Sequence, residues 1–268
     1  MPLENGQVLL GAHQSIAGGV AKALERGQEA GCDVVQIFVK NPSRWAAKPL
    51  SEQDIAAFNE AVSDTGIWPV FAHSIYLVNV ATPDDTLWTK SVAALTDDLE
   101  RCEQLGLSGL VMHPGSHRGA GERAGIARIV AALDEVHDRL SGYRAQVWLE
   151  VTAGQGDHLG YTLSQLGAMI DGVRQPERLG ICFDTAHAFA AGYELRTREG
   201  YEATWTEFAK DLGLDRLKAI HLNDSKRELG SRVDRHEQVG QGQLGIEPFR
   251  FLLNDARFRG IPMTLETD

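Results

Sequence analysis

The sequence predicts a single (β/α)8 barrel, or TIM barrel, that spans residues 1–268. Three observations predict it. The length of 268 residues is typical of one such barrel, eight short apolar runs recur along the chain, and amphipathic segments separate them. Runs that are apolar almost throughout are expected for parallel strands, which are covered on both faces. The expected strands are Val8–His13, Val34–Lys40, Trp68–Ser74, Gly109–Gly115, Ala145–Val151, Leu179–Thr185, Leu217–Asp224 and Ile261–Thr267.

The segments between these strands have the periodicity of amphipathic helices. In the second segment, Ile55, Phe58 and Val62 share one helical face, and Ser51 is placed to cap the N-terminus. A later segment repeats the pattern between residues 126 and 136. Eight strands separated by helices favour a closed parallel barrel.

Two features bear on the limits of this fold. A doubly wound open sheet usually has a G-x-G-x-x-G loop after its first strand, and Gly18-Gly19 does not match that pattern. The eighth expected strand reaches the end of the sequence, so the final helix of the barrel is missing from the predicted elements. Either the natural C-terminus is trimmed or the barrel closes without this helix.

Composition limits the cellular compartment in which we expect the protein and the kinds of ligand that it can bind. No run of about 18 apolar residues is present, and the start, MPLENGQ, lacks the pattern of a signal peptide, so we expect a cytoplasmic protein without a membrane span. Cys32, Cys102 and Cys182 are scattered, which argues against disulfides and thiolate zinc sites. The net charge of −11 disfavours DNA binding, although three divalent cations would offset six of these charges at the binding face.

Residue types that bind metals occur at the ends of six successive expected strands. Active sites of this fold form at the carboxyl ends of the strands. Three further candidates follow in loops on the same side, within the D-T-A-H and D-R-H elements. The strand-end candidates are His73, His113, Glu150, Asp184, His221 and Glu266, and the loop candidates are His187, Asp234 and His236.

These nine side chains predict a metal centre. A lone histidine at a strand end is usually a hydrogen-bonded structural residue, and Glu150 or Glu266 alone is compatible with a rim ion pair. Four carboxylates at one barrel mouth, however, would repel one another and lose solvation without cations between them. Nitrogen and oxygen ligands without sulfur favour Zn²⁺, and leave Mn²⁺ or Fe²⁺ open at some sites.

Several motifs carry a resemblance to one known family, in order along nearly the whole chain. The most specific are FDTAHAFAAGY (183–193) and the S-R-V-D-R-H element within GSRVDRHEQVGQGQLG (230–245). GAHQSIAGG (11–19), HPGSH (113–117), EVTAGQG (150–156), HLNDSK (221–226) and IPMTLET (261–267) accompany them. With these motifs the chain resembles endonuclease IV, the trinuclear-zinc apurinic/apyrimidinic endonuclease family, or deoxyribonuclease IV.

The resemblance implies a ligand set and an activity. One zinc would be held by His73, His113 and Glu150, and a second by Glu150 together with Asp184, His221 and Glu266. His187, Asp234 and His236 would hold the third. Family members incise double-stranded DNA 5′ to an abasic site, leaving a 3′-OH and a 5′-deoxyribose phosphate, and also trim blocked 3′ ends in base excision repair.

Two departures from the family pattern concern DNA contact and the C-terminus. The family usually has K-N-x-R-x-W after the second strand, whereas KNPSRW (40–45) has Ser43 in the arginine position and Arg44 one place later. Tyr76 fits the position of a residue that wedges into the duplex, its alternative being a rim tyrosine that packs on a loop. The ending ETD replaces a longer terminal segment. The candidate phosphate contacts, which have ordinary surface charge as the alternative, are Lys226, Arg232 and Arg235.

The residues favour phosphodiester hydrolysis, with Glu150 and Glu266 as candidate catalytic carboxylates. Two neighbouring cations can share a water and lower its pKa from 15.7 to about 7, while a third stabilises the leaving oxygen. A metal-dependent sugar isomerase or epimerase is the main rival, because such barrels also gather His, Asp and Glu at strand ends. A lesion-binding protein without catalysis is the second rival. The expected oligomeric state is a monomer.

Overall fold

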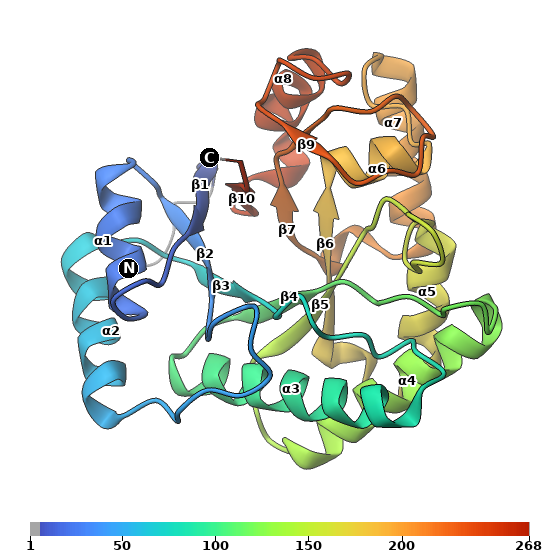
Figure 1. Ribbon diagram of the computed structural model, residues 1–268. Coiled ribbons are helices and arrows are strands. Elements are labelled where there is room, and N and C mark those ends of the chain that lie inside the picture. Colours follow the sequence, from blue (N-terminus) through green and yellow to red (C-terminus); the bar gives the residue numbers. More distant parts are fainter. Residues whose placement is uncertain (1–5, 268) are drawn as a thin grey trace.

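The computed structural model describes residues 6–267, so the start of the chain, used above to exclude a signal peptide, lies largely outside the described residues. Eight strands surround a central axis and helices cover their outer side (Figure 1). The barrel strands are β1 (Leu9–Gln14), β2 (Val34–Phe38), β3 (Val70–His73), β4 (Gly109–Met112), β5 (Gln146–Glu150), β6 (Leu179–Asp184), β7 (Leu217–His221) and β10 (Pro262–Leu265). The helices are α1 (Ala21–Glu29), α2 (Glu52–Thr65), α3 (Asp85–Gln104), α4 (Glu122–Arg139), α5 (Leu163–Gly172), α6 (Thr185–Ala191), α7 (Arg198–Asp211) and α8 (Glu247–Asn254).

The predicted TIM barrel is confirmed by the strand order. The parallel strands follow β1-β2-β3-β4-β5-β6-β7-β10, and β10 pairs with β1 to close the ring. All eight expected strands are present; seven of them end one to three residues earlier than predicted, whereas β1 runs one residue further, to Gln14. The helix cap at Ser51 is also confirmed, because its hydroxyl accepts from the backbone N–H of Asp54 in a capping box.

Side chains inside the barrel form layers, and the last of these layers lies at the barrel mouth. Phe71, Val111, Trp148, Cys182 and Ala219 make a separate buried cluster. Residues two positions apart on a strand point to the same face, so the side chains two residues beyond each of these also face the interior. Those side chains are His73, His113, Glu150, Asp184 and His221. The apolar layer therefore forms a floor beneath the polar layer at the barrel mouth.

Glycine makes room for the largest member of this floor. A Cβ atom on Gly109 or Gly180 would overlap the indole ring of Trp148. Both glycines precede an interior residue, Val111 and Cys182 respectively, by two positions on the strands that neighbour β5. The small-large pattern lets one tryptophan fill the barrel, as dense interior packing requires.

The seventh strand differs from its predicted extent. It ends at His221, and Asp224 instead begins β8 (Asp224–Ser225), which pairs antiparallel with β9 (His236–Glu237). This small sheet ties the long segment after β7 back onto the barrel mouth. Within residues 6–267, no helix follows β10, and no helix is long and apolar enough to cross a membrane. The three cysteines are free.

Candidate metal centre

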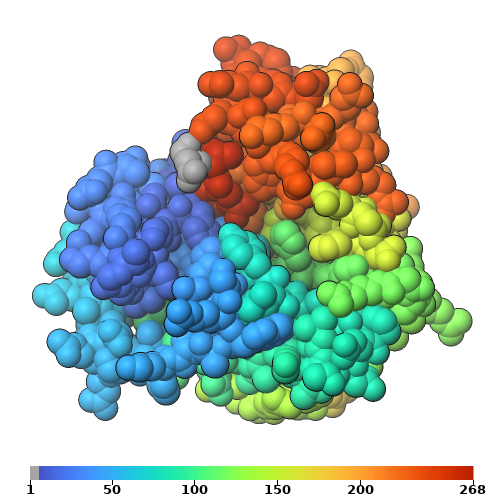
Figure 2. Space-filling view, in the orientation of Figure 1, coloured from blue at the N-terminus to red at the C-terminus, as the bar shows by residue number. Residues whose placement is uncertain are grey.

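The six strand-end candidates lie together at one end of the barrel. His73, Glu150, Asp184 and His221 are the last residues of β3, β5, β6 and β7. In-register pairing sets Asp184 directly beside His221. His113 follows β4, and Glu266 follows β10. This end of the molecule is hollowed near its centre, where segments from the N-terminal, middle and C-terminal parts of the chain meet (Figure 2). Parallel strands with matched ends thus bring distant residues to one place.

The first group joins two imidazoles to one carboxylate oxygen. Nε2 of His73 and Nε2 of His113 lie 3.0 and 3.1 Å from Oε2 of Glu150. His73 is almost fully buried, and its Nδ1 lies 2.8 Å from the carbonyl oxygen of Ser74, which accepts a hydrogen bond from it. Because Nδ1 donates, Nε2 is the ring nitrogen available to a metal ion.

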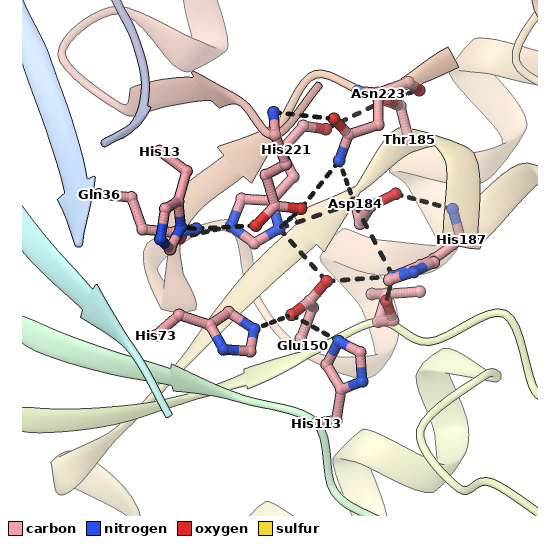
Figure 3. A network of polar contacts seen from close by, with 12 residues as sticks. His13, Gln36, His73, His113, Glu150, Asp184, Thr185, His187, His221 and Asn223 are labelled. Atoms are coloured by element: carbon pink, nitrogen blue, oxygen red, sulfur yellow. Dashed lines mark hydrogen bonds and ion pairs between the residues drawn. The ribbon is translucent and has the colours of Figure 1, made fainter. Parts of the chain in front are cut away.

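The second group uses the other oxygen of the same glutamate (Figure 3). Nδ1 of His221 lies 3.2 Å from Oε1 of Glu150 and 3.3 Å from Oε2 of Glu266. It lies 3.6 Å from Oδ2 of Asp184. Glu150 thus faces the first group with one oxygen and the second with the other, the geometry expected of a bridging carboxylate.

The third group joins His187 and His236, as the sequence motifs implied, to Asp184, while the predicted ligand Asp234 contacts both histidines. Nε2 atoms of His187 and His236 lie 3.3 Å apart, and the Asp234 carboxylate contacts them at 3.1 and 3.4 Å. Ligand atoms of Asp184, His187 and His236 lie close enough to hold a single ion. Asp184 therefore reaches both the second and the third group, while Asp234 approaches from the loop before β9.

The D-T-A-H element explains the double role of Asp184. This residue caps α6, since its Oδ1 accepts a hydrogen bond of 2.7 Å from the backbone N–H of His187. The cap turns His187 toward the cluster and leaves Oδ2 of Asp184 facing His221 and His236. A carboxylate at a helix N-terminus is further stabilised by the helix dipole.

The buried carboxylates of the cluster require positive charge close to them. Burial opposes ionisation of Glu150, yet the imidazoles of His113 and His221 hold the pKa of its carboxyl well below the usual range. Burial likewise opposes charge on His187, yet Asp184 and the other carboxylates raise its pKa well above the usual value. Either protonated imidazoles or bound cations can supply this charge.

The donor set fits divalent metal ions. Two imidazole nitrogens lie 3.3 Å apart, with carboxylate oxygens 3.1 and 3.4 Å from them, a spacing that suits ligands of one shared ion. The first and second groups share Glu150, and the second and third groups share Asp184. The thiol of Cys182 lies below the cluster, where burial raises its pKa to about 12 and disfavours the thiolate that binds metals. Nitrogen and oxygen ligands without sulfur match Zn²⁺, Mn²⁺ or Fe²⁺.

Comparisons with known proteins identify the family of this chain. The xylose isomerase-like TIM barrel model matches residues 24–268. A relative from Geobacter sp. (strain M21), named "Probable endonuclease 4", is 48% identical over 97% of this chain and 92% of its own length. A relative of the same name from Chloroflexus aurantiacus is 50% identical over 96% of this chain and 90% of its own length. The chain belongs to the endonuclease IV family. It is an enzyme of that family.

Solved structures extend the comparison. Endonuclease IV from Thermus thermophilus superimposes with a TM-score of 0.85 and 36% identity, covering 97% of this chain and 93% of that one. A D-tagatose 3-epimerase-like protein superimposes with a TM-score of 0.70 but only 18% identity, over 96% and 90% of the two chains. That second likeness shows the shared barrel alone, and the relation to endonuclease IV is the specific one.

Two of the side chains predicted to contact DNA in this endonuclease IV family member, Tyr76 and Arg235, line pockets that also contain ligand candidates. Tyr76 is 72% exposed, lines a pocket of about 480 Å³ at the barrel mouth, and places its ring edge-on 5.1 Å from Phe38. Arg44, Lys226 and Arg235 are exposed. Their side chains are accessible to a partner, as phosphate contacts require.

Arg232 is placed differently from the other candidate cations. Its guanidinium lies 4.0 Å over the ring of Tyr161, and its Nε donates to the carbonyl oxygen of Gly154 at 2.9 Å. The backbone of Arg232 has a φ of +54°, and its N–H donates to Ala190. These contacts show that Arg232 holds the D-R-H loop against the loop after β5 and against helix α6. A contact with DNA stays a prediction.

Three polar residues next to the cluster were missed from the sequence. Gln36 and Asn223 hydrogen-bond to the ligand candidate Glu266, and His13 hydrogen-bonds to Gln36. Burial lowers the pKa of His13 to about 4, so its ring is neutral. One signal was available, because Gln36 interrupts the otherwise apolar run V-V-Q-I-F, and a buried polar residue needs partners.

Proposed function

We propose that this enzyme hydrolyses the phosphodiester bond 5′ to abasic sites in double-stranded DNA, using three divalent metal ions. The observation that carries the proposal is the set of three ligand groups joined by Glu150 and Asp184 at the barrel mouth. Membership of the endonuclease IV family supports the DNA substrate. Zn²⁺ is the preferred metal on the chemistry of the donors, and Mn²⁺ or Fe²⁺ are alternatives at single sites.

Each ligand group has a distinct place in the proposed centre. His73, His113 and Glu150 would hold one ion, and Glu150 with the second group would hold another. His187 and His236 would hold the third with Asp184 or Asp234. When bound, divalent cations supply Lewis-acid activation of water and neutralise charge at the phosphoryl oxygens.

The reaction requires groups that take up and hold a proton. The oxygen of water forms a bond to phosphorus as one of its protons passes to a carboxylate, and the bond from phosphorus to the 3′ oxygen breaks. That oxygen takes up a proton, so the products are a 3′-OH and a 5′-deoxyribose phosphate. Glu150 and Glu266 are the carboxylates we assign to proton acceptance. The Glu266 side chain is 18% exposed and the Glu150 side chain 1%, so Glu266 is the more accessible to water.

Selectivity follows from the lesion rather than from base readout. An abasic nucleotide has no base to stack, so turning it into the pocket of about 480 Å³ costs little. The exposed Tyr76, Arg44, Lys226 and Arg235, together with Arg232, are the proposed DNA contacts. Binding through phosphates should weaken with salt and depend little on sequence.

Blocked 3′ ends present the same phosphodiester to the centre, so we expect trimming of these ends as a second activity, in base excision repair. We expect the chain to act as one TIM-barrel domain, as a monomer, in the cytoplasm where such DNA is accessible.

The test is incision of a duplex of about 30 base pairs that carries one abasic site and a 5′ label. We expect a single product ending in 3′-OH, its loss after treatment with EDTA, and its recovery when Zn²⁺ or Mn²⁺ is returned. Metal analysis of the purified protein should find close to three ions per chain.

The matched control is the same duplex with an intact base at that position, which should stay uncut. Incision that persists after complete metal removal would contradict the metal mechanism. No incision by metal-loaded protein, with one or two ions per chain, would favour the sugar isomerase alternative.

A further inference from the structure

Gln36 is a polar side chain inside an apolar strand. It lies in β2 between Val35 and Ile37 and is fully buried. Its two neighbours pack in the large core toward the helices, so alternation along the strand turns Gln36 toward the barrel interior. There it lies beside His13 and His221 (Figure 3). It also contacts Glu266.

Every polar atom of the Gln36 amide has a partner. Its Oε1 accepts a hydrogen bond of 2.7 Å from Nε2 of His221. Its Nε2 donates to Oε1 of Glu266 at 2.7 Å and to Nδ1 of His13 at 2.8 Å. The opposite orientation of the amide would set its oxygen against the carboxylate of Glu266. The carboxylate therefore determines which way the amide points.

This orientation selects one ring nitrogen of His221. An amide oxygen only accepts, so Nε2 of His221 carries the proton. The other nitrogen, Nδ1, is then the one with a free electron pair, and it faces Glu150, Asp184 and Glu266. A histidine that ligates a metal is commonly oriented in this way by a partner on its second nitrogen.

The same amide restrains Glu266. Oε1 of Glu266 is occupied by Gln36, while Oε2 accepts from Nδ2 of Asn223 at 3.0 Å and faces Nδ1 of His221. Asn223 also donates to Oδ2 of Asp184 at 2.7 Å and accepts from the backbone N–H of Glu266. The carboxylate is thus held from two sides, which leaves Oε2 directed at the second ligand group.

We propose that Gln36 is a positioning residue for the metal ion of the second group. It sets the tautomer of His221 and the orientation of Glu266, two ligands that come from different strands. The inference rests on the metal centre of the proposed function. It adds that one ion depends on an amide that does not itself touch the ion.

The test compares metal retention in Gln36→Met with that in the unsubstituted protein. Methionine has similar length and volume but neither donates nor accepts in this way. Each metal-loaded protein is titrated with a zinc chelator, and the ions released are counted. We expect one ion of the three to be held about 10- to 100-fold more weakly in Gln36→Met, with the other two unchanged.

Two further variants separate positioning from packing. Gln146→Met is the matched control, since Gln146 is also a strand glutamine bonded through both ends of its amide, at the opposite end of the barrel. It should release all ions as the unsubstituted protein does. Gln36→Asn keeps the amide but is one methylene shorter, and it should weaken the same single ion. It serves as the test if Gln36→Met does not fold.

The outcomes distinguish this inference from the proposed function. Equal retention of all ions in a folded Gln36 variant would overturn the positioning role and leave the metal centre intact. A uniform loss of all three ions together with a lower Tm would also overturn it, since that marks a structural role only. An unsubstituted protein that binds no ions would overturn both. Co²⁺ can replace the bound ions in the Gln36 variant and in the unsubstituted protein. A difference between their Co²⁺ spectra that is confined to one site would support the positioning role.

Discussion

The carboxylate of Asp224 holds the loop of residues 240–244, which follows the ligand candidates Asp234 and His236, and replacing Asp224 should loosen that loop. The side chain is fully buried at the start of β8. Its Oδ1 accepts from the backbone N–H groups of Ser225 and Leu244 at 2.7 and 2.9 Å. Its Oδ2 accepts from Gly240 and Gly242, both at 3.0 Å. One charged group therefore satisfies four backbone donors, three of them in the loop of residues 240–244.

Asp224→Asn replaces one of these acceptor oxygens with an NH2 group. Whichever way the amide turns, two backbone N–H groups lose their acceptor. Hydrogen bonds to charged groups contribute about 1.5–3 kcal/mol each, so the loss is about 3–6 kcal/mol. The loop can open locally, which limits the effect on the rest of the barrel. A loss of about 3 kcal/mol raises the opening equilibrium of the loop by more than about 100-fold.

Hydrogen exchange measures this opening directly. The peptide covering residues 236–246 should exchange at least about 100-fold faster in Asp224→Asn. Since β8 pairs with β9, and the N–H of Lys226 donates to the carbonyl of Arg235, the ion held by His236 should also be released more readily. Asp54→Asn, which alters an exposed capping box on α2, is the control and should leave this peptide unchanged. Unchanged exchange in Asp224→Asn would refute the reasoning.

Three further predictions concern the reaction, the DNA contact and stability. Glu150→Gln should lower turnover by about 100-fold or more, because the shared carboxylate is lost, with the Kd for abasic duplex nearly normal; unchanged turnover in single-turnover assays would count against its role. Tyr76→Ala should raise that Kd about tenfold in a fluorescence titration while Tm changes little, since the ring is 72% exposed; a normal Kd would remove Tyr76 from the interface. Burial beside Arg178 lowers the pKa of His137 from 6.5 to about 4. The unfolded chain therefore binds more protons between these values, and stability falls by up to about 3 kcal/mol as pH drops through them. His137→Leu should show a shallower fall in urea unfolding, and an identical pH dependence would contradict this.

Local pattern determined much of the fold and most of the ligand candidates. A strand buried on both faces needs a nearly continuous apolar run. The eight strands can therefore be recognised in the sequence without knowing which strands pair. Polar residues such as Glu150 and Asp184 stand out at the ends of those runs, where the fold places its active sites. The D-T-A-H spacing likewise follows from a local rule, the capping of a helix by Asp184.

Closure of the barrel decided what the pattern left open. Gln36 in β2 contacts Glu266 after β10, two strands that are not paired with each other, so their contact across the interior depends on the closed ring. Asp184 reaches two ligand groups because β9 brings His236 beside α6. Periodicity shows which face of its own strand a side chain occupies. The distance between side chains on separate strands is set only when all eight strands have paired. The sequence therefore determined the ligand types and their strands, and the tertiary structure decided which residues share an ion and which amides hold them.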